Sequence, residues 1–373
     1  MKKSILHVSE ATGWTGGLAR LLETSLGLKR KGWDIVIACH PQSDMVAPAE
    51  RGGLRILPVP VRQDYDVVAA YRIARYIKDN GVPLLHAHHP KAHAVCLLAK
   101  LLLGGSGGKA APKLIVSRRV SYRVGWNVFS SWKYRSGLID RYVAVAEAVK
   151  ANLAAAGVAG DRVTVIRSGV DMDKFAPRTG DPALRRELGL PAQGRLVVLV
   201  GNAAPAKGQS VFLEAASLLR RKLSDVHFLL VGRDTDARWM KEHVERLKLA
   251  PAVTLAGYRT DVPEVLALAD LSVNAAVAGE ALSGALRESL AMEIPVVASD
   301  LSGNGELVRD GETGRLCTPG DAGSMAANMQ WMLENSREAK DMARKGRLVV
   351  RAGFSLEASV DAADALYQGL LRG

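Results

Sequence analysis

The sequence predicts an α/β protein built from two Rossmann-like, doubly wound parallel-sheet domains. Three observations support this prediction. Strand-like and helix-like stretches alternate almost throughout, which is the pattern of parallel sheets covered by helices on both faces. The chain has 373 residues, and domains of about 100–200 residues make two domains the default. A stretch rich in proline and glycine, residues 172–195, marks a boundary.

The expected strands are short, β-rich runs. The first set is Ser4–Val8, Asp34–Ala38, Arg55–Pro58, Leu84–Ala87, Leu114–Ser117 and Tyr142–Ala146. The second set is Val163–Arg167, Leu196–Gly201, His227–Val231, Val253–Ala256, Leu271–Asn274 and Pro295–Ala298. Amphipathic stretches between them are expected to form helices, among them Leu18–Lys31, Val67–Asn80 and Val211–Lys222. We expect domains over residues 1–176 and 177–355 that face each other across a cleft, with ligands beyond the carboxyl ends of the strands.

Composition narrows the class of protein. Hydrophobic residues make up 48% of the chain and charged residues 24%, as in folded soluble proteins. The three cysteines lie far apart, and the longest apolar stretch is shorter than the roughly 20 residues of a membrane span. We therefore expect a cytoplasmic protein without a disulfide framework. A formal net charge of +12 favours anionic partners, such as nucleotides, nucleic acid, phospholipid head groups or phosphorylated glycans.

Glycine-rich loops follow the first expected strand of each domain. In the first loop, Gly16 and Gly17 open a helix, where backbone amides can approach a phosphate. The spacing is not that of a dinucleotide fingerprint, and a turn for tight packing explains the glycines equally well. In the second loop, Lys207 lies just before a helix and can neutralise a diphosphate, although an exposed loop lysine is the commoner case.

A third loop carries two carboxylates, Glu280 and Glu288, on either side of Ser283. This serine is suited to cap a helix that holds Glu288 about a turn and a half further on. A carboxylate near the helix start can accept hydrogen bonds from sugar hydroxyls, and a deeper one can bind the hydroxyl pair of a ribose. The alternative is a first-turn acid followed by a solvated helix face. The mostly apolar neighbours of Glu288 argue against that alternative.

These loops belong to a series of motifs that covers nearly the whole chain. In order, the series comprises Gly16-Gly17-x-x-Arg20, His86-Ala-His88, Val143–Lys150, Val165–Asp171, the two glutamates with seven residues between them, and Gly305–Gly314. Together the motifs resemble those of the family-4 retaining glycosyltransferases of GT-B fold. The resemblance implies transfer of a sugar from a nucleotide-sugar donor, with retention at the anomeric carbon and without a metal or other cofactor.

The resemblance also implies roles for matching residues. Lys207 would contact the donor diphosphate. Glu280 would lie against the transferred sugar, with His88 near it as a second catalytic residue, and Glu288 would hold the ribose. The terminal helix, residues 356–373, would cross back to the N-terminal, acceptor-side domain, and residues 177–355 would bind the donor. The expected donor-binding residues are Gly16, Gly17, Asn202, Lys207, Arg233, Tyr258, Ser283, Gly284 and Glu288.

Some positions depart from the family pattern. Asn202 stands where arginine is frequent, which leaves more of the charge neutralisation to Lys207, and Arg233 after the next strand could compensate. Ser283 replaces a frequent glycine, and Gly284 replaces a frequent larger residue. These changes alter the sugar-facing loop, so the donor sugar stays open.

Two features look like metal sites, but we expect no metal. The triplets Asp171–Asp173 and Asp234–Asp236 match the D-x-D of metal-dependent glycosyltransferases, yet the first is expected to be a turn, and hard cations need more oxygen ligands. A histidine-rich stretch suggests zinc, but no acidic or cysteine partner is close in sequence. A core histidine at His86 and a neutral histidine near the sugar are preferred. The stretch comprises His86, His88, His89 and His93.

Residues 109–135 combine basic and aromatic side chains with no acid. This composition suits single-stranded nucleic acid, an anionic membrane surface or an anionic glycan, and buried rings beneath a solvated face would also explain it. We favour acceptor and peripheral membrane contact at the inner face of the cytoplasmic membrane, with no nucleic acid bound. Ser117-Arg118-Arg119 is frequent in lipopolysaccharide-type glycosyltransferases, which implies a bacterial surface-glycan acceptor. The expected acceptor or membrane residues are Arg118, Arg119, Arg123, Trp126 and Trp132.

Two alternatives remain. A sugar-nucleotide 2-epimerase shares this fold but would lack an acceptor surface. A basic nucleic-acid-binding protein would need no Glu280–Glu288 pair, and its binding should collapse as salt is raised.

Overall fold

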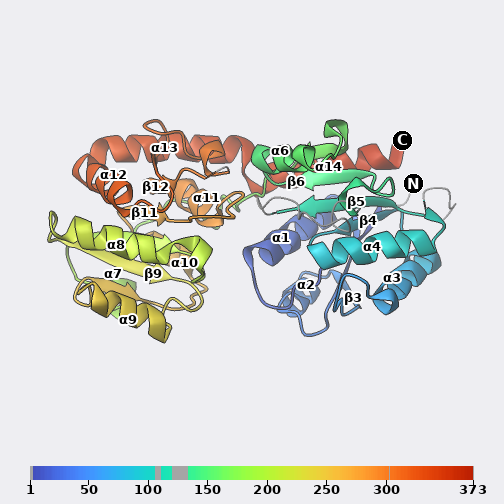
Figure 1. Cartoon of the computed structure of the whole chain (residues 1–373), viewed down its shortest axis with the longest axis horizontal. Helices are drawn as coiled ribbons and strands as arrows, with labels where there is room; N and C mark the ends of the chain where they lie inside the picture. Colours follow the sequence, from blue (N-terminus) through green and yellow to red (C-terminus); the bar gives the residue numbers. More distant parts are fainter. Residues whose placement is uncertain (1–2, 106–110, 120–132, 302, 373) are drawn as a thin grey trace. The chain divides into compact units, whose positions relative to one another are not determined.

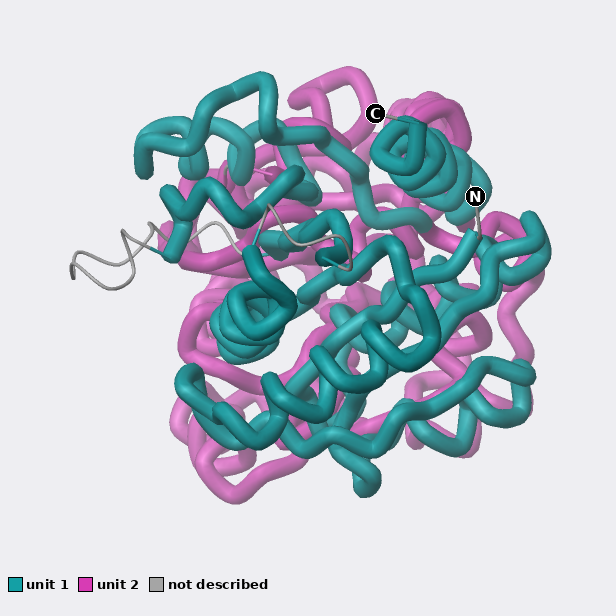
Figure 2. Tube along the Cα trace, turned by 90° about the vertical axis from the view of Figure 1, so that its right-hand side faces the viewer, with its two compact units in different colours: residues 1–169, 356–373 teal, residues 170–355 magenta. Residues whose placement is uncertain are grey.

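The computed structural model describes residues 3–105, 111–119, 133–301 and 303–372, and its elements fall into two compact units (Figure 2). Unit 1 comprises Met1–Gly169 and Leu356–Gly373, and unit 2 comprises Val170–Ser355. The division follows Gly169, whereas the sequence placed it after Ala176. Val170 belongs to unit 2 because its amide donates to the Phe354 carbonyl at 2.9 Å and its side chain is buried in that unit's core.

Unit 1 holds a seven-stranded parallel sheet of order β3-β2-β1-β4-β5-β6-β7 (Figure 1). Its strands are β1 (Ser4–Val8), β2 (Asp34–Cys39), β3 (Arg55–Pro58), β4 (Leu84–Ala87), β5 (Lys113–Arg118), β6 (Arg141–Ala144) and β7 (Val163–Val165). Its helices are α1 (Gly16–Arg30), α2 (Val46–Arg51), α3 (Val67–Asn80), α4 (Pro90–Leu102), α6 (Glu147–Ala155), the 3₁₀ turn η2 (Gly160–Arg162) and α14 (Leu356–Arg372).

Unit 2 holds a six-stranded parallel sheet of order β10-β9-β8-β11-β12-β13. Its strands are β8 (Arg195–Val200), β9 (Val226–Val231), β10 (Val253–Leu255), β11 (Leu271–Asn274), β12 (Val296–Ser299) and β13 (Arg315–Cys317). Its helices are α7 (Pro182–Glu187), η3 (Pro205–Lys207), α8 (Gln209–Arg220), α9 (Arg238–Arg246), α10 (Val262–Leu266), α11 (Gly284–Ala291), η4 (Asn304–Glu306), α12 (Ala322–Glu334) and α13 (Ser336–Gly353).

The predicted pair of doubly wound parallel sheets is confirmed. One strand, β13, was not expected from the sequence. It has only three residues, and Arg315 at its start interrupts the apolar run by which a strand is recognised. Pairing with β12 at the sheet edge forms the strand, with Val297 opposite Arg315.

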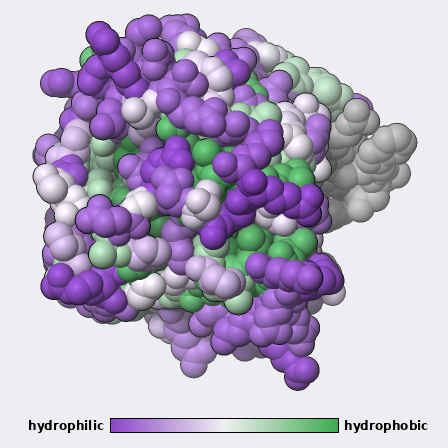
Figure 3. All heavy atoms as spheres, turned by 90° about the vertical axis from the view of Figure 1, so that its left-hand side faces the viewer, coloured by the Kyte–Doolittle hydropathy of each residue, from purple (hydrophilic) through white to green (hydrophobic). Residues whose placement is uncertain are grey.

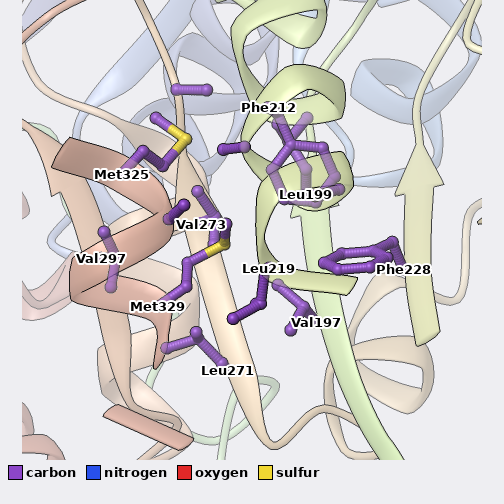
Figure 4. Close-up of a cluster of buried hydrophobic side chains, with 14 of the residues drawn as sticks. Val197, Leu199, Phe212, Leu219, Phe228, Leu271, Val273, Val297, Met325 and Met329 are labelled. Atoms are coloured by element: carbon purple, nitrogen blue, oxygen red, sulfur yellow. The ribbon is translucent and has the colours of Figure 1, made fainter. Parts of the chain in front are cut away.

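Buried side chains cover both faces of the sheet in unit 2. Alternate residues of β8 point to opposite faces, as the period of a strand requires: Val197 and Leu199 join one core cluster, and Leu196 and Val198 join the other. The first cluster includes Phe212 of α8 together with methionines of α12 (Figure 4). Burial on both faces explains why the strands are apolar without interruption.

The last helix, α14, belongs to unit 1. Gly27 of α1 makes room for it, because a Cβ there would lie 2.4 Å from Cγ2 of Val360. Trp33 Nε1 donates to Asp364 Oδ1 at 2.8 Å, and the buried ring of Tyr367 reaches the centre of the sheet. The terminal helix therefore supplies part of the core and, through Tyr367, part of the polar cluster described below.

Hydrophilic side chains predominate on the face drawn in Figure 3, with hydrophobic ones in smaller patches between them. Across the described residues, every helix is too short or too polar to serve as a membrane span.

Candidate functional site

In unit 2, the loops after β8 and β9 meet at the carboxyl edge of the sheet. Gly232 has a φ of 149°, and a Cβ there would lie 2.3 Å from the Gly201 carbonyl oxygen, so only glycine permits this approach. Asn202 Oδ1 accepts a hydrogen bond from the backbone amide of Arg233 at 3.0 Å. Asn202 therefore joins the two loops and holds Arg233 at this edge.

Lys207 ends the 3₁₀ turn η3 and reaches the loop after β11. Gly208 makes this possible with a φ of 68°, since a Cβ there would lie 1.9 Å from the Ala275 carbonyl oxygen. Lys207 Nζ lies 2.6 Å from Glu280 Oε2. The lysine side chain is 43% exposed and the glutamate side chain 9% exposed, so the carboxylate is buried while the ammonium still faces solvent. The structure thus brings together two residues that the sequence placed in separate loops.

Ser283 caps α11, as the sequence predicted. Its side chain accepts a hydrogen bond from the Leu286 amide at 3.4 Å and another from Asn274 Nδ2 at 3.0 Å. Glu288 is partly exposed, and its Oε1 lies 3.8 Å from the position that a Cβ on Gly284 would occupy. Two carboxylates thus flank one helix start, where backbone amides carry positive potential. An anion and a set of hydroxyl groups could be bound there together.

Arg233 and Tyr258 also lie together. The guanidinium carbon of Arg233 is 5.1 Å from the centroid of the Tyr258 ring, a cation–π distance, and the tyrosine is 51% exposed. An exposed ring beside a cation suits stacking with a planar aromatic ligand.

In unit 1, the two glycines that begin α1 have no packing reason to be glycine. A Cβ at Gly16 would meet nothing within 4 Å, and one at Gly17 would make ordinary contacts of 3.7 Å with His89 and 3.8 Å with Arg119. Thr15 caps the helix, its side chain accepting a hydrogen bond from Leu18. The packing explanation for Gly16 and Gly17 is therefore weakened.

A cluster of buried histidines lies beside that loop and consists of His7, His86 and His88. Parallel pairing of β1 with β4 places His7 opposite His86 in register. His7 Nδ1 lies 2.8 Å from His88 Nε2. Both ring nitrogens of His86 have partners, the Tyr367 hydroxyl at 2.7 Å and the Ser117 hydroxyl at 2.8 Å. His86 is thus a satisfied core residue, as the sequence favoured.

Burial keeps these rings neutral. It is the main cause that lowers the pKa of His7 to about 3, and it lowers the pKa of His88 well below its usual range. The positive charge of Arg119 adds to both effects. A neutral His88 can act as a polar hydrogen-bonding group, but it carries no charge of its own near neutral pH.

The three histidines could in principle hold a metal, since their ligand atoms lie within 4.8 Å of one another. The hydrogen bonds oppose this interpretation. Arg119 Nη2 lies 3.3 Å from His88 Nδ1, and a guanidinium can only donate, which makes the region electropositive. Metal-bound histidines normally donate their second N–H to an acceptor such as a carboxylate. Metal independence stays a prediction.

The two neighbouring arginines of residues 109–135 have different environments. Arg118 is buried at the end of β5, and its Nη1 donates to the Tyr134 hydroxyl at 2.7 Å. Arg119 is partly exposed and lies beside His88. Of the other expected contact residues, Arg123, Trp126 and Trp132 lie outside the residues that the structure describes.

The two D-x-D triplets have backbone roles. Asp171 Oδ1 accepts hydrogen bonds from the amides of Asp173 at 3.0 Å and Lys174 at 2.9 Å, which is the turn that the sequence predicted. Asp234 adopts a left-handed conformation with a φ of 61° in the loop after β9.

Sequence reasoning missed His7 and Tyr367. Each lies far along the chain from its partners. A histidine at a buried strand position was the signal, because a polar ring buried in a sheet needs a partner on a neighbouring strand.

Comparison with known proteins agrees with both halves of the fold. The model of glycosyltransferase family 4 matches residues 15–174, and the model of glycosyl transferases group 1 matches residues 181–349. Together the two models span most of the chain.

Among curated proteins, the chain is similar to the putative glycosyltransferase EpsD of Bacillus subtilis, with 24% identity over 86% of this chain and 85% of that one. It is also similar to the phosphatidyl-myo-inositol mannosyltransferase of Mycobacterium leprae, with 27% identity over 75% and 73% of the two chains.

Solved structures share the fold. A glycosyltransferase from Rickettsia africae superimposes with a TM-score of 0.87 at 21% identity, covering 100% of this chain and 99% of that one. Anabaena Alr3699/HepE in complex with UDP and glucose gives 0.85 at 19% identity, covering 98% and 100%. With both family models in order and this fold throughout, the chain belongs to the family-4 glycosyltransferases of GT-B fold.

Proposed function

We propose that this glycosyltransferase moves a sugar from a nucleotide-sugar donor to an anionic glycan or glycolipid in bacterial surface polysaccharide synthesis, of the lipopolysaccharide type. In this proposal the reaction retains the anomeric configuration and needs no metal. The observation that carries it is the contact of Lys207 with Glu280 beside the capped start of α11, which also holds Glu288.

The geometry of unit 2 supports a division of roles. The exposed ammonium of Lys207 is suited to a diphosphate, and the amides at the start of α11 add positive potential for the same group. Glu280, buried at 2.6 Å from that ammonium, would face the sugar and stabilise positive charge that develops at the anomeric carbon. Glu288 would accept hydrogen bonds from the ribose hydroxyls, and Tyr258 with Arg233 would stack on the base.

Similar proteins that bind or are named for a nucleotide sugar make this the first class of ligand to test. Anabaena Alr3699/HepE has been solved with UDP-glucose, and one relative is a UDP-Gal:alpha-D-GlcNAc-diphosphoundecaprenol alpha-1,3-galactosyltransferase. We expect one nucleotide sugar in a panel of UDP, GDP, ADP and CMP sugars to raise the melting temperature. A ligand at 100 times its Kd adds about 2.7 kcal/mol to the free energy of unfolding. Absence of a shift across the whole panel would contradict the proposal.

Contact with an anionic membrane is the second part of the proposal. Around the start of α3, four large apolar side chains are 58–67% exposed: Tyr65, Val67, Val68 and Tyr71. Exposed Arg62 and Arg72 lie among them. Exposed rings and aliphatic groups interspersed with arginine suit an anionic bilayer surface, where each basic residue adds about 1 kcal/mol of attraction. A lipid-linked acceptor would then meet the enzyme at the membrane.

Vesicle sedimentation tests this contact. We expect the chain to sediment with phosphatidylglycerol-containing vesicles more than with pure phosphatidylcholine, and the pair Val68→Ser with Tyr71→Ser to reduce binding several-fold. Leu348→Ser is the matched control, since Leu348 is 66% exposed on α13 of unit 2. Equal binding by the double variant and the control would reject this surface.

The alternatives differ in their support. EpsD, the Mycobacterium leprae mannosyltransferase and the Rickettsia africae protein are named as glycosyltransferases, and they give no support to a sugar-nucleotide 2-epimerase. That the chain binds no nucleic acid stays a prediction, which a salt titration of binding to single-stranded DNA would check.

A further inference from the structure

No carboxylate among the described residues forms an ion pair with Arg119. Its Nη2 contacts His88 Nδ1 at 3.3 Å, and its Nε is buried without a hydrogen-bond partner. Arg119 lines two neighbouring cavities of unit 1, of about 40 and 90 Å³, and no described residue that lines either of them is an aspartate or glutamate. The neighbouring Arg20, by contrast, pairs with Glu23 at 3.0 Å.

Such an arrangement is costly unless a ligand completes it. A charge taken out of water needs a partner of opposite sign or several hydrogen bonds. Burial lowers the pKa of Arg119 to about 10, so the side chain remains charged at neutral pH. Because the side chain is partly exposed, a group from solvent can reach it.

The hydrogen-bond chain behind Arg119 also ends in a donor. A guanidinium only donates, so Nδ1 of His88 accepts, and the neutral ring carries its proton on Nε2. That N–H then donates to His7 Nδ1 at 2.8 Å, which leaves the proton of a neutral His7 on Nε2. His7 Nε2 is buried and has no partner. His7 lines the smaller cavity, so this cavity is lined by two residues with an unsatisfied donor, Arg119 and His7.

The smaller cavity is large enough for a compact ligand. Its volume of about 40 Å³ exceeds the roughly 10–15 Å³ that a single water needs. Hydroxyl groups of Thr24, Ser117 and Tyr367 also line it, and neutral His86 takes the proton of either Ser117 or Tyr367. Apolar side chains form the rest of the wall, among them Leu21, Val143 and Ile166. The unsatisfied donors of His7 and Arg119 and the cations Arg20 and Arg119, with no carboxylate in the described lining, select an acceptor of negative charge and disfavour a metal ion.

We propose that Arg119 and His7 form a binding site for a compact oxyanion in the smaller cavity, where His88 links the two residues by hydrogen bonds. The oxyanion is a phosphate or carboxylate group carried by the acceptor. The assignment of this anion to the acceptor rests on the proposed function, whereas binding of the anion itself does not. Arg118 takes no part, because its guanidinium faces Tyr134.

Anion binding to the full chain tests the site. We expect inorganic phosphate to raise the melting temperature of the wild type, and Arg119→Gln to weaken the apparent affinity about tenfold or more, since a charge-assisted contact is lost. Lys207→Gln removes the cation of unit 2 that could also bind phosphate, so a phosphate response that persists in this variant belongs to the site at Arg119. An unchanged response in Arg119→Gln, or its loss in Lys207→Gln alone, would overturn the proposal.

A spectroscopic readout covers the case in which Arg119→Gln fails to fold. Phosphate or acetate should shift the Nε2 resonance of ¹⁵N-labelled His7 in the wild type. Arg119→Lys keeps the positive charge but loses the two parallel N–H donors of the guanidinium, so it should need more anion for the same shift. A stronger response to phosphate identifies a phosphorylated acceptor, and a stronger response to acetate identifies a carboxylated one. No His7 shift with either anion would reject the site.

The same preparations separate this proposal from the proposed function. Arg119→Gln should keep its thermal response to the nucleotide sugar found with the wild type. A chain that binds a nucleotide sugar but no small anion at Arg119 would leave the transferase proposal standing and remove this one.

Discussion

At the scale of single residues, the site in unit 2 depends on one short contact. Lys207 and Glu280 lie 2.6 Å apart, and the glutamate is the more buried of the two. A buried carboxylate beside a half-exposed lysine has its charge balanced before any ligand arrives. The lysine can then contact a diphosphate while it still fixes the position of Glu280.

This arrangement predicts different defects for three substitutions. Glu280→Gln should lower kcat by about 100-fold or more with little change in donor affinity, because the carboxylate acts on charge that develops in the transition state. Glu288→Ala and Lys207→Ala should weaken donor binding instead. Titration calorimetry and initial rates would separate the two effects. An equal loss of donor affinity in all three variants would contradict the division of roles.

At the scale of elements, α11 depends on its cap. Ser283 accepts hydrogen bonds from the helix amide of Leu286 and from the side chain of Asn274, at the end of β11. Asn274 Oδ1 accepts a third bond, from Asn304 Nδ2 at 3.2 Å. The helix start is thereby tied to the strand before it and to the loop after β12.

Removal of the cap should therefore affect both stability and binding. Ser283→Ala should lower the free energy of unfolding by about 1 kcal/mol, since the Leu286 amide and the Asn274 amide each lose an acceptor. We expect a weaker donor response as well, because Glu280 and Glu288 flank this turn. Urea denaturation measures the first effect, and Ser283→Thr should recover most of the loss. A stable Ser283→Ala variant with normal donor binding would contradict this role.

At the scale of the whole molecule, buried neutral histidines link stability to pH. Burial is the main cause that lowers the pKa of His7 to about 3 and the pKa of His89 and His227 to about 4, against 6.5 for a free histidine. Between pH 6.5 and about 4 the unfolded chain binds protons at these positions and the folded chain does not. Stability is therefore full above pH 6.5 and falls as the pH decreases through that window.

The expected slope is measurable. Each such histidine should cost about 1.4 kcal/mol of unfolding free energy per pH unit below 6.5. Urea midpoints at pH 7.5, 6.5 and 5.0 should show a flat segment followed by a decline. His227→Gln should make the decline shallower. The matched control is His40→Gln, because His40 is partly exposed. A midpoint constant from pH 7.5 to 5.0 would disprove this coupling.

Periodicity and loop chemistry were enough to predict the sheets and the residues around α11. Ser283, Glu280 and Glu288 lie within nine positions of one another, so local helix geometry fixes their arrangement. The three-residue strand β13 was missed because it exists through its pairing with β12 rather than through its own composition.

The sequence by itself determined the fold class, the family and the two glutamates at one helix start, because each is recognised from short stretches of neighbouring residues taken in order. Only the tertiary structure decided which distant side chains meet. It paired Lys207 with Glu280, placed His7 and Tyr367 beside His86, and directed Arg118 to Tyr134 but Arg119 to His88. These contacts follow from strand register and helix docking, whose energies come from burial across the whole unit and leave no local pattern in the sequence.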